Sequence, residues 1–256
     1  IDTPVDLSDP ELAGANIVDK SRCTLEPSQT SSPHGNWMAA LLVSQNYGVA
    51  PDATLYTYQT ATDGAASSGS CKQGANKLDR MENLINQAID DGAQIISISL
   101  SNNERSSGIK WAITRAINEG VIIVSSSGNE AIYDDFSHLG RWSGVVGVTA
   151  INTDGTFASY SSWGNGVVTA AVGGPVTIRD ANTGELTTTS GTSNATALVS
   201  GMLALARQKW PSATTNQILQ SLVRSGLNPN HEWNQYTGYG AIDGGGLVID
   251  DPSQYP

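Results

Sequence analysis

The segment with the clearest chemical meaning runs from Thr189 to Ala195, because it places Ser193 at the start of an apolar, helix-like run. A serine at a helix N-terminus lies near unpaired backbone N–H groups and the positive end of the helix dipole. Those groups favour negative charge, so the position suits a nucleophile whose reaction generates an oxyanion. Taken alone, Ser193 is better explained as a helix N-cap, since cap serines are common.

A nucleophilic serine also needs a base, and the chain offers only three histidines. His34 stands at the start of an apolar helix-like run, whereas His138 and His231 lie in polar loop sequences and are expected at the surface. The base must in turn be oriented by a carboxylate, for which Asp2 is the candidate. A residue so close to the chain end would be expected to fray if it stood alone.

Charge and composition limit the kinds of molecule that the protein is expected to bind. The net charge is −11, from 24 acidic and 13 basic residues, which argues against binding to nucleic acid or to an anionic membrane. No stretch of about 18 consecutive apolar residues is present, so no membrane span is predicted. Hydrophobic residues make up 39% of the chain, which is typical of a globular protein with a sizeable core. We expect a monomer.

The two cysteines, Cys23 and Cys71, lie in polar, serine-rich segments. They lack a Cys-x-x-Cys spacing and so do not indicate a zinc site. We expect a disulfide between them, which would favour an oxidising, extracytoplasmic compartment, with two free thiols as the alternative.

Strands and helices are predicted to alternate along the chain. β-Branched runs predict strands at 53–58, 94–100, 121–124, 145–150 and 167–172. Apolar residues at helical spacing predict helices at 78–91, 107–119, 192–209 and 214–225. This order indicates a three-layer α/β fold, doubly wound, with a mostly parallel central sheet and helices on both faces. Residues 1–256 are expected to form a single domain.

In such a sheet, ligands bind at the carboxyl ends of the strands. The residues that follow the predicted strands are Ser99-Leu100-Ser101, the 125–130 segment, and the loop leading into Ser193. We therefore expect the functional site at these three places.

Three separated segments resemble the signature motifs of the subtilisin-like serine proteases, the subtilases. Asp2-Thr3 resembles the family's Asp-[Thr/Ser]-Gly motif. His34-Gly35-Asn36 resembles its His-Gly-Thr motif, and Gly191-Thr192-Ser193 resembles its Gly-Thr-Ser motif. A fourth segment, Gly128-Asn129, resembles the family's Gly-Asn motif, and similarity continues almost to the end of the chain. The order Asp, His, Ser is that of the subtilisins.

The resemblance implies a serine endopeptidase. Ser193 would be the nucleophile, His34 the general base and Asp2 the carboxylate that orients the imidazole. The Asn129 side chain and the Ser193 backbone N–H would bind the oxyanion. The resemblance also implies substrate-binding roles for two sets of residues. Ser99, Leu100 and Ser101 would pair with an extended protein or peptide substrate. The S1 pocket would be lined by Ser126, Ser127, Gly128 and Gly140.

The chain also departs from the family motifs. The family glycine after Asp-Thr is replaced by Pro4, the threonine of His-Gly-Thr by Asn36, and the methionine after the nucleophile by Asn194. Met38, Ala40 and Ala197 replace valine, glycine and proline. These departures leave open a second function, a catalytically weak subtilase homologue that acts as a peptide-binding module. An esterase of the α/β-hydrolase class is less favoured, because Ser193 lacks the Gly-x-Ser-x-Gly elbow.

The resemblance carries two further expectations. The chemistry requires no cofactor, and the family's structural calcium site is not indicated, because the loop between the His34 helix and Gly48 is short. In relatives the catalytic aspartate ends a central strand, whereas here only Ile1 precedes Asp2. We therefore expect the 256 residues to lack the N-terminal strand of a longer protein.

Overall fold

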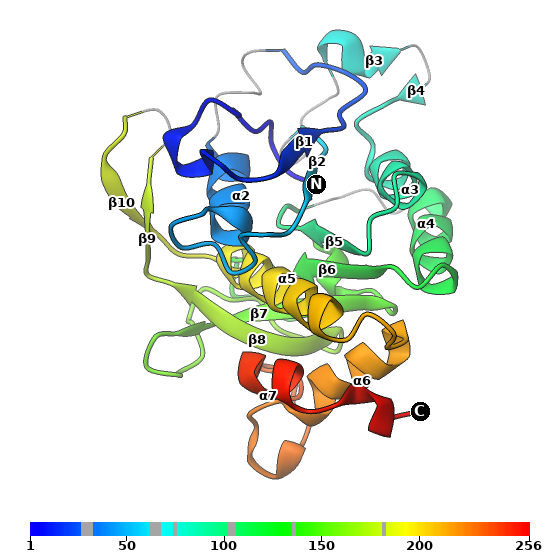
Figure 1. Cartoon of the computed structure of the whole chain (residues 1–256), viewed down its shortest axis with the longest axis vertical. Helices are drawn as coiled ribbons and strands as arrows, with labels where there is room; N and C mark the ends of the chain where they lie inside the picture. Colours follow the sequence, from blue (N-terminus) through cyan, green and yellow to red (C-terminus); the bar gives the residue numbers. More distant parts are fainter. Residues whose placement is uncertain (27–32, 62–67, 74–75, 102–105, 135–136, 181–182) are drawn as a thin grey trace.

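The computed structural model describes residues 1–26, 33–61, 68–73, 76–101, 106–134, 137–180 and 183–256. Its main sheet is parallel, and its strands lie in sequence order (Figure 1). They are β5 (Ile95–Ile98), β6 (Ile122–Ser126), β7 (Val145–Asn152) and β8 (Val167–Gly174). A separate two-stranded parallel sheet consists of β1 (Ile17–Asp19) and β2 (Leu55–Thr57). Because the main strands are parallel, their carboxyl ends share one edge of the sheet.

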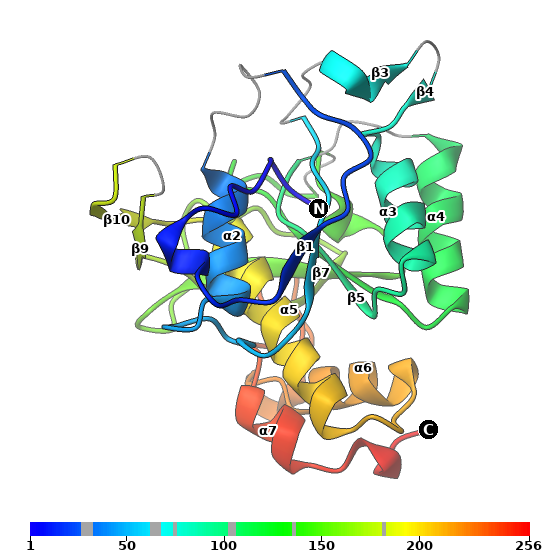
Figure 2. The same ribbon diagram turned by 45° about the horizontal axis from the view of Figure 1, so that its top comes forward.

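Helices cover both faces of the main sheet (Figure 2). They are α3 (Met81–Asp90), α4 (Ser107–Asn118), α5 (Thr192–Lys209) and α6 (Thr215–Arg224). Ile123 of β6 packs in one core with α3 and α4, whereas its neighbours Ile122 and Val124 pack in another with α5 and α6. This division follows from the alternation of side chains along a strand. The predicted three-layer α/β fold is confirmed.

The remaining elements lie around these layers. The helices are α2 (His34–Val43) and α7 (Gly244–Ile249), and the strands are β3 (Lys72–Gln73), β4 (Asn76–Lys77), β9 (Val176–Arg179) and β10 (Leu186–Thr189). The short 3-10 turns are η1 (Pro10–Leu12), η2 (Gly69–Cys71), η3 (Leu139–Arg141), η4 (Pro229–His231) and η5 (Pro252–Gln254). None of the helices in the described ranges combines the length and apolar character needed to cross a bilayer.

The predicted elements all occur, with differences at their ends. The strand expected at 53–58 is only Leu55–Thr57, and the helix expected at 78–91 begins at Met81. The 192–209 helix has the predicted bounds. The sequence did not indicate α7, because three consecutive glycines disfavour a helix. Its first turn is capped by Asp243, whose Oδ1 accepts from the Gly246 N–H at 2.9 Å.

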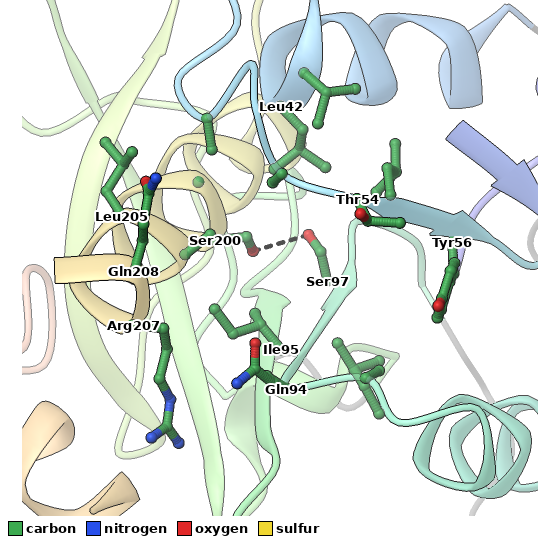
Figure 3. Close-up of a pocket in the computed structure, with 18 of the residues that line it drawn as sticks. Leu42, Thr54, Tyr56, Gln94, Ile95, Ser97, Ser200, Leu205, Arg207 and Gln208 are labelled. Carbon is green, nitrogen blue, oxygen red and sulfur yellow. Dashed lines mark hydrogen bonds between the residues drawn. The ribbon is translucent and has the colours of Figure 1, made fainter. Parts of the chain in front are cut away.

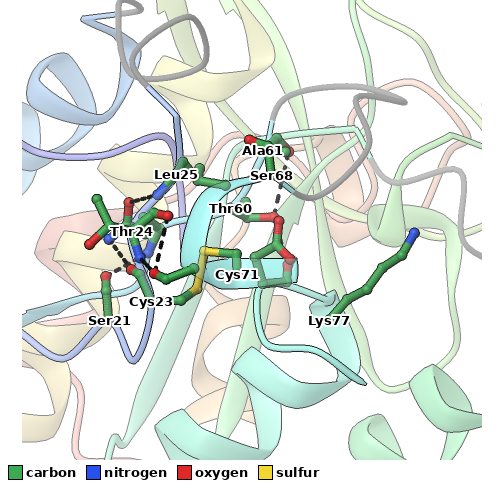
Figure 4. Close-up of a disulfide and its surroundings, with 12 residues drawn as sticks. Ser21, Cys23, Thr24, Leu25, Thr60, Ala61, Ser68, Cys71 and Lys77 are labelled. Carbon is green, nitrogen blue, oxygen red and sulfur yellow. Dashed lines mark hydrogen bonds between the residues drawn. A yellow bond between two sulfur atoms is a disulfide. The ribbon is translucent and has the colours of Figure 1, made fainter. Parts of the chain in front are cut away.

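Cys23 and Cys71 form the predicted disulfide (Figure 4). Their Cα atoms lie 4.8 Å apart, and both side chains are buried in a small apolar cluster with Leu25. The bond joins the segment after β1 to η2, where Ser70 N also donates to Thr24 O at 3.1 Å. The disulfide therefore anchors a peripheral, polar part of the chain that has little apolar core of its own.

Removal of the disulfide should lower stability. Cys23 and Cys71 are 48 residues apart, and the crosslink reduces the conformational entropy of that loop in the unfolded chain. The double variant Cys23→Ala/Cys71→Ala should lose about 2–4 kcal/mol in the free energy of unfolding, measured by urea denaturation. As a control, dithiothreitol should destabilise the parent protein but leave the double variant unaffected. A double variant as stable as the parent would contradict this prediction.

Candidate active site

Ser193 lies in the first turn of α5, at the edge of the sheet where the β-strands end. The helix begins after Gly191, which has no side chain to cap the first N–H groups. Ala195 and Val199 are fully buried against the sheet and hold the helix in place. Ser193 is 9% exposed, so its hydroxyl sits in a largely water-excluded position near the positive end of an 18-residue helix.

Asn129 reaches the same helix terminus from the loop after β6. The turn before it requires Gly128, whose φ of +108° lies in a region that other residues disfavour. Asn129 Oδ1 accepts from the Thr192 N–H at 2.8 Å and from the Thr192 hydroxyl at 3.0 Å. The carboxamide thus caps α5 with its oxygen, and its NH₂ group is fixed on the other side.

The NH₂ group of Asn129 and the backbone N–H of Ser193 flank one small space. A Cβ atom built on Gly191 would lie 3.5 Å from Asn129 Nδ2 and 3.7 Å from Ser193 N. Both nitrogens therefore lie close to the same position beside Gly191. Two N–H donors close to a serine are the kind of groups that could stabilise an oxyanion.

His34 and Asp2 form a close pair. The distance from His34 Nδ1 to Asp2 Oδ1 is 2.7 Å, and their side chains are 23% and 12% exposed. The same carboxylate oxygen accepts from the Thr3 N–H at 2.7 Å. A carboxylate only accepts, so it places the imidazole proton on Nδ1 and leaves Nε2 as the basic nitrogen.

Asp2 does not fray. Its N–H donates to Tyr58 O at 3.1 Å, and its carbonyl oxygen accepts from Thr60 N at 2.9 Å. The Ile1 amino group donates to Ser97 O at 2.9 Å. These bonds hold the residue between the β2 and β5 segments, although it is the second residue of the chain.

The first turn of α2 holds the Asp2 segment through Gly35 and Asn36. A Cβ on Gly35 would lie 2.2 Å from Thr3 O, so only glycine permits this approach. Asn36 is buried, and its Oδ1 accepts from Asp6 N at 2.9 Å. Its Nδ2 donates to Asp6 O at 3.0 Å and to Asp9 Oδ2 at 2.8 Å. In the sequence Asn36 is only a departure from the family motif, because no sequence signal links it to Asp9 and Asp6, 27 and 30 positions away.

The predicted substrate-binding residues fall into two groups. Ser99, Leu100 and Ser101 follow the end of β5, and Ser99 lies against the nucleophile position, since its Oγ donates to Ser193 O at 3.2 Å. The others gather at the end of β6, where a Cβ on Gly140 would lie 2.6 Å from Ser126 O. There Ser127 Oγ donates to Ser162 O at 2.8 Å. Both groups lie at the edge of the sheet expected from strand order.

The prediction for His138 is wrong. It was expected at the surface, but its side chain is buried, and its Nδ1 lies 2.9 Å from Ser126 Oγ. The polar residues before His138 predicted an exposed loop. In the structure, η3 packs against the end of β6 and His138 is buried with it. His231 is exposed, as predicted. Across the described residues, no group of three or more His, Cys, Asp or Glu side chains is arranged to hold a metal ion.

Comparison with known proteins agrees with this geometry. The chain belongs to the Subtilase family, whose profile matches residues 1–240. It is 32% identical over 231 residues to the thermostable alkaline protease of Halalkalibacterium halodurans, which covers 87% of this chain and 58% of that protein. It is 31% identical over 232 residues to subtilisin Savinase of Lederbergia lenta, covering 87% of this chain and 78% of that protein. The chain thus spans 58% of the length of the first of these relatives.

The solved structure of the prenylagaramide maturation protease PagA has the same fold. The TM-score is 0.77 at 24% sequence identity, and the match covers 96% of this chain and 90% of that one. The predicted family and fold class are therefore confirmed.

Replacing Asn36 with alanine should destabilise the protein more than the small size of the asparagine side chain suggests. Asn36→Ala removes three hydrogen bonds and leaves the buried Asp9 carboxylate without one donor, at an expected cost of about 2–4 kcal/mol in urea unfolding. Asn46→Ala, at an exposed asparagine just beyond α2, is the matched control and should change stability by less than about 0.5 kcal/mol. Equal effects of the two substitutions would argue against the role of Asn36.

Proposed function

We propose that this chain is a serine endopeptidase. The observation that carries the proposal is the His34–Asp2 pair at 2.7 Å in a fold that also sets Ser193 at the start of α5 beside Asn129. Membership of the Subtilase family supports the same reaction. Acyl transfer needs a nucleophile, an oriented base and oxyanion donors, and in this proposal Ser193, His34 and Asn129 supply them.

In the proposed reaction, Ser193 Oγ attacks the carbonyl carbon of the scissile peptide while its proton passes to His34 Nε2. Asp2 stabilises the resulting imidazolium through Nδ1. The carbonyl oxygen becomes an oxyanion that accepts from Asn129 Nδ2 and Ser193 N. His34 then gives the proton to the leaving amine, and a water molecule hydrolyses the acyl-enzyme by the same route in reverse.

One contact favours the rival function of a peptide-binding module with little activity. The Ser193 hydroxyl donates to Ser99 O at 2.9 Å, so its proton is directed at a backbone carbonyl. Catalysis requires the hydroxyl to turn from Ser99 O to His34 Nε2. Catalytic hydrogen bonds often form only when substrate binds, and for this reason we favour the enzyme.

The proposed substrates are proteins or peptides in an extended conformation. The chain after β5, at Ser99 to Ser101, lies next to Ser193 and offers backbone groups with which an extended substrate could pair. The Cys23–Cys71 disulfide supports a secreted or extracytoplasmic site of action, because such bonds persist in oxidising compartments.

Labelling with a fluorophosphonate tests the nucleophile. The parent protein should be labelled at Ser193, and Ser193→Ala should abolish labelling because no activated hydroxyl remains. Ser190→Ala, at an exposed serine three residues earlier, is the matched control and should label like the parent. Absence of labelling in the parent would favour the peptide-binding module, and equal labelling of Ser193→Ala would refute Ser193 as the nucleophile.

The substitution Asn129→Asp tests the oxyanion donor without removing the cap on α5. The aspartate keeps an oxygen for the Thr192 N–H but replaces the NH₂ donor with a second acceptor. We expect kcat to fall about 10²–10³-fold with little change in KM, measured on a chromogenic peptide. Asn46→Asp, which makes the same charge change at an exposed position, should leave kcat unchanged. A rise in KM alone would contradict the assignment.

A further inference from the structure

An endopeptidase holds its substrate on both sides of the scissile bond, and the segments proposed to pair with the substrate account for the acyl side only. The cavity of about 580 Å³ in Figure 3 belongs to neither side. Tyr56 and Ile95 line it, whereas Ser193, His34 and Asn129 do not. A surface for the leaving-group side must therefore lie elsewhere around Ser193.

The chain after Asn129, the proposed oxyanion donor, runs beside the segment that follows β7. Ala131 N donates to Tyr160 O at 2.9 Å. Further along, Trp163 N donates to Ile132 O at 3.1 Å. In the main sheet β7 lies on the far side of β6 from β5, so this ladder leads from the proposed catalytic centre away from β5.

Tyr160 connects the ladder to the loop that carries the nucleophile. A Cβ atom built on Gly173 would lie 2.6 Å from the Tyr160 hydroxyl oxygen and 2.9 Å from Gly191 O. The hydroxyl is thus close to Gly191, two residues before Ser193. The ladder is therefore continuous with the surroundings of Ser193.

Three aromatic side chains gather at the end of the ladder that is distant from Asn129. Tyr133 and Trp163 are partners in a parallel bridge, so their side chains point to the same face of the ladder. The rings of Trp163 and Tyr236 are stacked, with centroids 5.7 Å apart. Tyr133 is 49% exposed and Tyr236 is 43% exposed. We call Tyr133, Trp163 and Tyr236 the aromatic platform.

The aromatic platform is fixed although it is exposed. Asn165 Nδ2 donates to the Tyr133 hydroxyl at 2.7 Å, and the Asn165 N–H donates to Asp134 Oδ1 at 2.9 Å. Phe157 packs edge-on against Tyr236, with ring centroids 5.3 Å apart. Exposed rings that are already fixed lose little conformational entropy when a ligand covers them. The platform is therefore suited to bind an apolar side chain.

The backbone on both sides of Tyr133 is unusual. Ala131 has a φ of +53° and Asp134 a φ of +46°, a region that residues with side chains disfavour. Such conformations persist where the surrounding contacts fix them, and they are frequent at ligand-binding sites. The local strain agrees with a binding role for this loop.

The length of the loop indicates which part of a substrate reaches the platform. Tyr133 is four residues after Asn129, a distance of at most about 14 Å along an extended chain. An extended substrate advances about 3.3 Å per residue. About four residues of substrate therefore cover this distance.

We propose that the aromatic platform binds an aromatic or aliphatic side chain of the substrate about three to five residues beyond the scissile bond. The proposal rests on the endopeptidase function proposed above. The substrate half before the bond pairs with Ser99 to Ser101 near β5, so the half after the bond continues toward β7, where the platform lies. Apolar residues on the leaving-group side then contribute to substrate selection.

Two substrates separate the aromatic platform from the catalytic centre. The first is a chromogenic peptide whose leaving group is the chromophore itself, so it does not extend to the platform. The second is a fluorescence-quenched peptide with phenylalanine as the fourth residue after the scissile bond. Tyr133→Ala should raise KM for the long peptide about tenfold with little change in kcat, because ring contacts are lost in the bound complex. KM for the chromogenic peptide should change much less.

Two further variants make the test specific. Tyr133→Phe keeps the ring and loses only the hydroxyl bonded to Asn165, so KM for the long peptide should stay close to that of the parent. Trp111→Ala, at a tryptophan on α4 that is 73% exposed, is the matched control and should leave both substrates unaffected.

Binding measured without cleavage separates this proposal from the endopeptidase function. In a Ser193→Ala background, Tyr133→Ala should raise the Kd of the long peptide about tenfold by fluorescence polarisation, whether or not the parent is an active protease. An unchanged Kd and KM for the long peptide would overturn the proposal. Equal KM changes for both substrates, or a loss with Tyr133→Phe as large as with Tyr133→Ala, would also overturn it.

Discussion

The arrangement of the site depends on one very close approach, in which the Thr3 carbonyl lies against Gly35 at the start of α2. A Cβ on Gly35 would be 2.2 Å from that oxygen, so any other residue would push the two segments apart. The approach brings Asp2 to His34 and is maintained by Asn36, which bonds to both Asp6 and Asp9. The Asp2 carboxylate is thus held in place by backbone hydrogen bonds of Asp2 and its neighbours to other elements.

The second half of the site is organised by the N-terminus of α5. Its first N–H groups carry partial positive charge, and Asn129 satisfies one of them with its oxygen while its NH₂ group flanks the same space as Ser193 N. One carboxamide therefore caps the helix and provides a donor.

Departures from the family motifs become understandable through local hydrogen bonds and packing. Asn194 stands where the family has methionine, and its Nδ2 donates to Gly173 O at 3.0 Å in a buried position. Ala197 is fully buried beside Met38, so a smaller residue on α5 faces a larger one on α2. These changes alter the packing around Asp2, His34, Asn129 and Ser193. They remove none of the groups that the proposed chemistry uses.

The sequence by itself determined the alternating elements, the layered fold, the disulfide and the candidate residues Asp2, His34, Asn129 and Ser193, because these follow from local periodicity and from short motifs. It failed for His138 and for α7, where burial and a single Asp243 cap outweigh the polar or glycine-rich local sequence. Only the tertiary structure decided that Asp2 is fixed, that Asn36 holds it, and that Tyr133 lies beside Trp163. These features are contacts between residues tens of positions apart, and no local pattern in a single chain encodes which distant groups will meet.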